Sequence, residues 1–132
     1  MGPSSSHTRS GHRALGAEGE QRAAEHLARQ GYRIVDRNVR AGGVELDLVA
    51  RRGSVLVFVE VKTRRTHRFG APELAVDAHK RARLVRGAAA WLHEHGSRGA
   101  HIRFDVVACE VGPGSPPRWH IRHLEGAFDA GD

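Results

Sequence analysis

The stretch Val55-Leu-Val-Phe-Val-Glu-Val-Lys62 constrains the fold more than any other part of the chain. Side chains of a strand alternate between two faces, and both faces of this stretch are apolar at first. Such a strand belongs in the middle of a sheet that is covered on both sides. Glu60 and Lys62 then place two charges on one of these faces, at the end of the most apolar run of the chain.

The pattern of apolar runs and turn residues predicts two helices and five strands. The helices are expected at residues 14–30 and 73–95, and the strands at 32–39, 44–50, 54–62, 101–111 and 118–124. The order αβββαββ predicts an α/β protein in which helices flank a mixed sheet. We expect one domain over residues 14–128, a disordered N-terminal tail at 1–13 and a loose C-terminus at 129–132.

The charge of the chain favours an anionic partner. The 132 residues include 21 Lys and Arg against 15 Asp and Glu, a formal net charge of +6. This excess suits nucleic acid or an anionic membrane surface, or it serves solubility alone. No apolar run approaches the roughly 20 residues of a membrane span, and no secretory signal is present. We therefore expect a cytoplasmic protein that does not bind a membrane.

Three elements direct a carboxylate toward the interior. Asp47 lies between Leu46 and Leu48 within a strand, and Glu20 lies at the centre of the apolar stripe of the first helix. Together with Glu60 they form a set that is costly to bury unless it is paired or binds a cation. A structural ion pair with Lys62 or an arginine is one interpretation. A metal or catalytic site is the other, because one lysine cannot neutralise three carboxylates.

Basic residues follow this set in two places. Arg64, Arg65 and Arg68 come directly after Lys62. On the second helix the predicted inward stripe is Leu74, Ala78, Ala82, Val85, Ala89 and Leu92, while His79, Lys80, Arg83 and Arg86 gather on another side. Such a basic stripe suits a DNA backbone, with a solvated helix face as the alternative.

Asp47, followed by a turn and then by Glu60-Val61-Lys62, resembles the PD-(D/E)XK signature of restriction-endonuclease-like folds. More closely, the chain resembles the YraN-like family of small bacterial proteins with that fold. The matching blocks are LGAEGEQRAAEHL, GYRIVDRNVR, ELDLVA, FVEVKTR, FGAPELAVDAHK, RFDVVACE and GAF. The sequence departs from the family at Val44, where a glycine is usual.

The resemblance implies a Mg²⁺- or Mn²⁺-dependent endonuclease that hydrolyses phosphodiester bonds. It implies a metal held by Asp47, Glu60 and the Val61 carbonyl, with Lys62 acting on the attacking water. Glu20 would match the helix carboxylate of Holliday-junction-resolvase-like proteins. Arg64, Arg65, Arg68, Lys80 and Arg83 are the expected nucleic-acid contacts, and DNA is the expected partner. A catalytically silent nucleic-acid-binding module or adaptor is the alternative, and the substrate structure and a homodimeric assembly stay open.

Overall fold

The computed structural model describes residues 4–69, 76–97 and 101–130. Its elements, in chain order, are α1 (Ser4–Arg29), β1 (Arg33–Ala41), β2 (Val44–Arg52), β3 (Val55–Arg65), α2 (Ala78–Glu94), β4 (His101–Val111) and β5 (Trp119–Phe128). The predicted order αβββαββ and the α/β class are confirmed. Each predicted strand matches an observed one, with ends displaced by a few residues.

The five strands form one mixed sheet in the order β1-β2-β3-β4-β5. β3 and β4 are parallel and are joined by the crossover that contains α2, and the other neighbours are antiparallel. β3 is therefore the central strand, and residues 56–60 are buried on both of its faces. The expectation drawn from its apolar run is confirmed.

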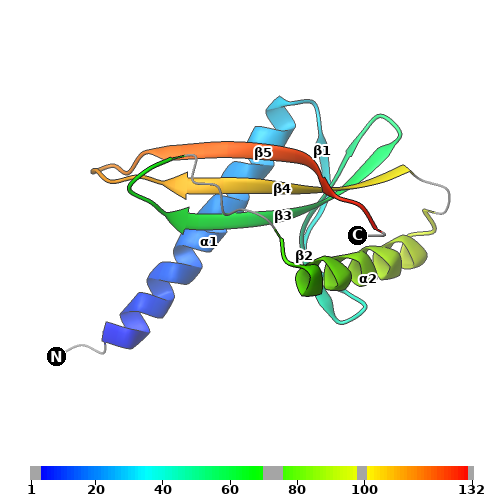
Figure 1. Ribbon diagram of the computed structural model, residues 1–132, viewed down its shortest axis with the longest axis horizontal. Coiled ribbons are helices and arrows are strands. Elements are labelled where there is room, and N and C mark those ends of the chain that lie inside the picture. The colour runs from blue at the N-terminus through cyan, green and yellow to red at the C-terminus, as the bar shows by residue number, and fades with distance from the viewer. Residues whose placement is uncertain (1–3, 70–75, 98–100, 131–132) are drawn as a thin grey trace.

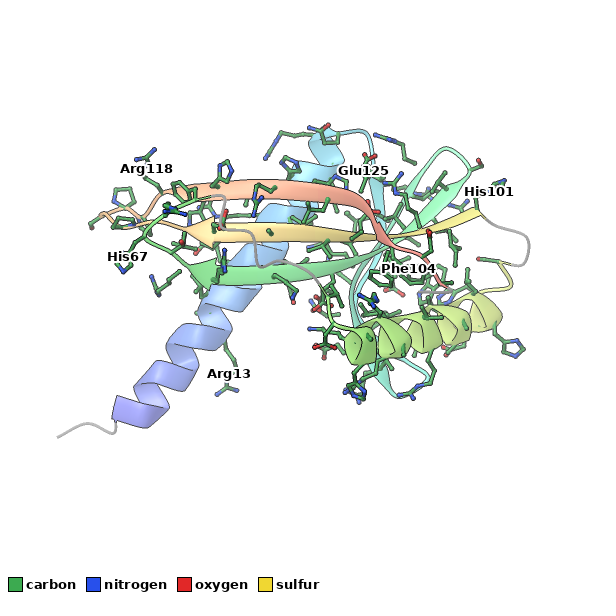
Figure 2. The ribbon with its side chains drawn as sticks, viewed as in Figure 1. Arg13, His67, His101, Phe104, Arg118 and Glu125 are labelled. Atoms are coloured by element: carbon green, nitrogen blue, oxygen red, sulfur yellow. The ribbon has the colours of Figure 1, made fainter. Side chains whose placement is uncertain are left out.

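The two helices cover opposite faces of the sheet (Figure 1). Val57 and Val59 of β3 pack in the core beneath α1, whereas Leu56 and Phe58 pack in the core beneath α2. Beneath α2, the side chain of Phe104 contacts the rings of Phe58 and Phe128 (Figure 2). Each helix thus excludes water from one face of β3, and this burial of apolar surface is the main driving force for assembly.

α1 begins at Ser4, ten residues before the start that the sequence pattern indicated, so residues 4–13 belong to the helix. The early turns project beyond the sheet, and Arg13 points away from it (Figures 1 and 2). Extending a formed helix needs no tertiary contact, which is why apolar periodicity did not reveal these turns. Neither α1 nor α2 is long and apolar enough to cross a membrane.

α2 is rotated relative to the predicted stripe. Its buried residues are Leu84, Gly87, Ala88 and Trp91. Of the residues predicted to face inward, Ala78, Ala82 and Ala89 are exposed, Val85 and Leu92 are half-buried, and Leu74 lies outside the described residues. The helix begins at Ala78 with Asp77 as its N-cap, so the expected start at 73 is also wrong.

A fully buried carboxylate fastens the end of α1 to β4 and β5. Asp105 accepts hydrogen bonds from Nε and Nη2 of Arg103 and from the Gly126 N–H, and His123 Nε2 lies 2.6 Å away. Arg103 also donates to the hydroxyl of Tyr32, just after α1. Burial alone would raise the pKa of Asp105, but the hydrogen bonds from His123 and Arg103 outweigh burial and lower it. This carboxylate is therefore compensated.

Gly19 allows α1 to approach β3 closely. A Cβ atom at this position would lie 1.9 Å from Oγ1 of Thr63, while one at Gly16 would meet nothing within 4 Å. Cys109 Sγ donates to the Gly19 carbonyl at 3.4 Å, and burial raises the pKa of this thiol to about 11. Cys109 is fully buried. The close approach also sets the position of the next residue, Glu20.

We expect Gly19→Ala to lower the free energy of unfolding by ~1–3 kcal/mol, because the new methyl group overlaps Thr63. Gly16→Ala is the matched control on the same helix. It should raise the stability by up to ~1 kcal/mol through helix propensity. Urea unfolding measures both. A Gly19→Ala variant as stable as Gly16→Ala would contradict the close packing of α1 on β3.

Candidate active site

The site forms where β2 and β3 separate. Their backbone pairing runs from Arg52↔Val55 to Leu48↔Val59 and then stops. Beyond this point Oδ2 of Asp47 accepts the next hydrogen bond, from the Val61 N–H at 2.9 Å. A side chain thus replaces the backbone of β2 along this edge of β3. The N–H and C=O of one strand residue point to the same edge, so the Val61 carbonyl also faces Asp47.

Glu60 lies on the α2 face of β3, beside this separation. Its side chain is only 8% exposed, and Lys80 Nζ lies 2.5 Å from its Oε2 atom. Lys80 is in the first turn of α2, four residues before the buried Leu84. Residues four apart share a helix face, so Lys80 extends the buried stripe toward the sheet. Lys80 was predicted to lie on the basic side of the helix with His79 and Arg83, and all three line one cavity. Its contact with Glu60 was not predicted.

Asp47 carries charge that its neighbours compensate only in part. Burial, and next the charge of Glu60, raise the pKa of Asp47 to about 7. The hydrogen bond from Val61 and the charge of Lys80 oppose this rise, and Glu20 adds to it. Asp47 and Glu60 therefore lie close enough to repel each other, as a pair of ligands for one cation would.

Glu20 approaches the same carboxylates from α1. It is half-buried, and burial raises its pKa. A hydrogen bond from Asn38 opposes this rise, while the charges of Glu45 and Glu60 add to it. The three predicted carboxylates are thus electrostatically linked, although they come from three different elements.

Lys62 is half-buried on β3, two residues beyond Glu60. Its charge acts on Asp77, the N-cap of α2, whose pKa is lowered chiefly by the hydrogen bond from the Lys80 N–H. The Asp77 carboxylate, which accepts that bond at 2.8 Å, therefore links the two lysines. Lys80 contacts Glu60 directly, whereas the charge of Lys62 acts on Asp77.

A cavity of about 400 Å³ joins Asp47 and Glu60 to the start of α2, whereas Glu20, Val61 and Lys62 are not among its lining residues. Its lining residues are Val44, Glu45, Asp47, Glu60, Asp77, His79, Lys80, Arg83 and Leu84. Oxygen atoms gather beside the first turn of α2 (Figure 2). The site prediction omitted three of the polar lining residues. Glu45 shares a strand face with Asp47, a signal already present in the sequence. Asp77 was missed because the helix was expected to begin at 73, and His79 was assigned to the basic side of the helix but not to the site.

The departure at Val44 is accommodated by the preceding turn. Gly42 and Gly43, which join β1 to β2, both have positive φ, as a type I′ hairpin turn requires. Ala41 pairs with Val44 across this turn. Val44 is then an ordinary strand residue, and its side chain is buried against Gly87 of α2. The valine forms an apolar wall of the cavity.

The remaining predicted basic residues do not form a single patch. Arg64 donates to the fully buried Glu110 at 3.1 Å, a pairing that the sequence did not reveal. Arg65 is the next residue of β3 and points to the opposite face of the sheet. Arg68 follows the strand and is exposed, as Arg83 is on α2. Of these four arginines, only Arg83 lines the cavity.

The donor set suits a hard divalent cation. Carboxylate and carbonyl oxygens are the ligands that Mg²⁺ and Mn²⁺ prefer, and Asp47, Glu60 and Val61 supply them. The raised pKa of Asp47 reflects negative charge that such a cation would offset. Within residues 4–69, 76–97 and 101–130, no group of three His, Cys, Asp or Glu side chains is arranged to hold a metal. Two carboxylates and a backbone carbonyl are therefore the set to test.

The fold and the site together define a class of protein. A mixed sheet between two helices in the order αβββαββ is compatible with a restriction-endonuclease-like fold. At the separation of β2 and β3 this sheet carries the carboxylates Asp47 and Glu60.

The chain belongs to the family described as uncharacterised protein family UPF0102, the YraN family, whose sequence pattern matches residues 19–109. It is 52% identical over 118 residues to a UPF0102 protein of Symbiobacterium thermophilum, which covers 89% of this chain and 98% of the relative. A UPF0102 protein of Geobacter sulfurreducens is 48% identical over 115 residues, covering 87% and 88%. One of Frankia alni is 50% identical over 115 residues, covering 87% and 94%.

The raised pKa of Asp47 predicts a pH dependence. The folded-state pKa of about 7 exceeds the ordinary value of 3.8. The folded protein therefore binds the extra proton, and its stability rises as the pH falls through 7. Without metal, the free energy of unfolding of the wild type should increase relative to Asp47→Asn by up to ~1.4 kcal/mol per pH unit between pH 7 and 5.

Urea unfolding in EDTA at a series of pH values measures this difference. Glu94→Gln removes an exposed carboxylate at the end of α2 and is the control. Its stability should run parallel to that of the wild type at every pH. Parallel curves for Asp47→Asn as well would contradict the proposed crowding.

Proposed function

We propose that the protein is a divalent-metal-dependent nuclease that hydrolyses phosphodiester bonds, with DNA as the expected substrate. The observation that carries this proposal is the crowding of Asp47 and Glu60 at the separation of β2 and β3, opposite cationic residues of α2 in one cavity. Buried carboxylates that lack full compensation are a feature of catalytic and metal sites. A fold assembled only for stability gains nothing from them.

The residues fit the chemistry of hydrolysis in distinct roles. Asp47 and Glu60, with the Val61 carbonyl, would hold Mg²⁺ or Mn²⁺. When bound, such an ion lowers the pKa of a water molecule and offsets charge that develops on the phosphate. Lys62 lies two residues from Glu60, where a compact ammonium group could orient the water or stabilise the phosphate oxygens. Glu20 would add a third carboxylate from α1, whose charge acts on Asp47.

Arg83 and His79 support a polyanionic substrate. Both line the cavity from α2, whereas Asp47 and Glu60 line it from the sheet. An exposed arginine beside such a cavity can bind a phosphate next to the bond that is cut, and a histidine can donate a hydrogen bond to it. The net charge of +6 supports the same partner.

A nucleic-acid-binding module that does not cut is the second candidate, and the Lys80–Glu60 ion pair favours it. In that case the ammonium group would neutralise Glu60 permanently, and no metal would be needed. The two functions differ in a single measurable property, which is cleavage that requires a divalent ion.

We expect the wild type to cleave DNA only in the presence of Mg²⁺ or Mn²⁺. Asp47→Asn and Glu60→Gln should abolish cleavage, and Lys62→Met should lower its rate by about 100-fold or more, the cost of removing one charge-stabilising group. Lys62→Arg should not restore activity, because a planar guanidinium does not replace a compact ammonium. Cleavage of linear, branched and single-stranded DNA and of RNA is followed on gels.

Arg33→Met, on the edge strand β1, is the control and should cleave as the wild type does. Cleavage that survives Asp47→Asn would come from a contaminant or from another site. Binding without cleavage on all four substrates would select the non-cutting module instead.

Binding should depend steeply on salt if exposed arginines contact phosphates. We expect Arg83→Ala and Arg68→Ala each to flatten the slope of log affinity against log salt by about 0.7–0.9 and to weaken binding of all sequences equally. Arg29→Ala, at the end of α1, should leave the slope unchanged. Fluorescence anisotropy in EDTA measures these slopes, and equal slopes for all variants would exclude the predicted contacts.

A further inference from the structure

We propose that Lys80 is a positioning residue of this site, whose ammonium group neutralises Glu60 until a divalent cation binds and then turns to the nucleic-acid phosphate. This inference rests on the proposed function. It adds a role for Lys80, which the sequence analysis expected only to contact nucleic acid. In this scheme Glu60 is paired first with the Lys80 ammonium group and then with the divalent cation.

The ion pair is asymmetric in burial. The Glu60 side chain is 8% exposed and fixed on the central strand, whereas the Lys80 side chain is 48% exposed. Lysine carries its charge on a flexible four-carbon stem. The ammonium group can therefore leave Glu60 without any change in the backbone, while the carboxylate stays in place.

The backbone of Lys80 is held firmly even though its side chain is free to move. Its N–H donates to Asp77 Oδ1 at 2.8 Å, which caps α2. The neighbouring Arg81 donates from Nη1 to the Val76 carbonyl at 2.8 Å. The first turn of α2 thus holds the backbone of Lys80 in place, and only the side chain needs to move.

The charges of the cavity decide which cation Glu60 prefers. Among the described residues, the carboxylates of Glu45, Asp47, Glu60 and Asp77 line it, together with the cations Lys80 and Arg83. One ammonium group contacts Glu60 but leaves Asp47 with only partial compensation. A divalent ion shared by Asp47 and Glu60 would bring more charge to both. It would also repel the ammonium group, and the half-exposed Lys80 side chain can then turn into the cavity that it lines.

The first test measures the ion pair without metal. Lys80→Met should lower the melting temperature in EDTA, and the same change should have a smaller effect in a Glu60→Gln background. Lys80→Arg should restore much of the loss, since a guanidinium also pairs with a carboxylate. Additive effects in the double variant would mean that the pair does not exist in solution, and the proposal would fall.

The second test measures competition. Mn²⁺ should bind Lys80→Met about tenfold more tightly than the wild type, because the competing cation is gone. Arg83→Met, one turn away in the same cavity, should bind Mn²⁺ as the wild type does. Isothermal titration calorimetry gives these affinities without any activity assay. Equal affinities in all three proteins would overturn the exchange while leaving the metal site intact.

The third test follows the ammonium group to the phosphate. Adding Ca²⁺, a hard cation of the same charge, should steepen the salt dependence of DNA binding by roughly 0.7–0.9, or one phosphate contact. The Lys80→Met variant should show no such increase, whereas Arg83→Met should retain it. A slope that Ca²⁺ leaves unchanged in the wild type would overturn this step.

The outcomes also separate this inference from the proposed function. Failure of Mn²⁺ to bind any of the three proteins at millimolar concentration would contradict the metal-dependent nuclease. Coupling between Lys80 and Glu60 in EDTA would then identify a permanent ion pair and overturn the exchange as well. Metal binding and cleavage without competition from Lys80 would sustain the nuclease and reject the inference alone.

Discussion

The hydrogen bond from the Val61 N–H to Asp47 is the interaction on which the site depends. Where β2 and β3 part, β3 would expose an unpaired backbone group in a half-buried place, and the Asp47 carboxylate supplies the missing acceptor at 2.9 Å. The same separation leaves room for the cavity and turns the Val61 carbonyl toward it. The carboxylate that satisfies the backbone therefore also concentrates negative charge beside Glu60. Continued pairing of β2 with β3 would remove the site, because the backbone groups of Val61 would then bond to β2 and leave no place for the Asp47 carboxylate.

Comparison of the fully buried Asp105 with the half-buried Asp47 distinguishes a structural carboxylate from a functional one. Asp105 accepts hydrogen bonds from Arg103 and Gly126 and lies beside His123, and its pKa is lowered despite burial. Asp47 has the Val61 N–H and the more distant charge of Lys80, and its pKa is raised to about 7. The compensated group holds α1 against β4 and β5. The uncompensated group lines a cavity, where a cation could supply what the protein does not.

The sequence was sufficient to predict the order of elements, the central position of β3 and the carboxylates Glu20, Asp47 and Glu60, because each rests on a clear periodicity that a charge interrupts. It was insufficient for the phase of α2. That helix carries alanines on several sides, so its apolar stripe is poorly defined, and one of its true inward positions is Gly87. A glycine is inward there because β2 approaches too closely for a side chain: a Cβ atom would lie 3.1 Å from Val44 and Leu46. Such an approach is a property of the packed structure and leaves little trace in hydropathy.

The phase of α2 also explains why the contact between Lys80 and Glu60 was not predicted. Lys80 precedes Leu84 by four residues, so it continues the buried stripe of Leu84, Ala88 and Trp91 toward the sheet. The predicted inward stripe ran through the alanines and did not contain Lys80. In the observed rotation of α2, Lys80 lies at the end of the apolar contact. It therefore faces the charged end of β3 and pairs with Glu60. The packing of α2 and the electrostatics of the site are therefore one constraint: the rotation that buries Trp91 also brings an ammonium group to the carboxylate.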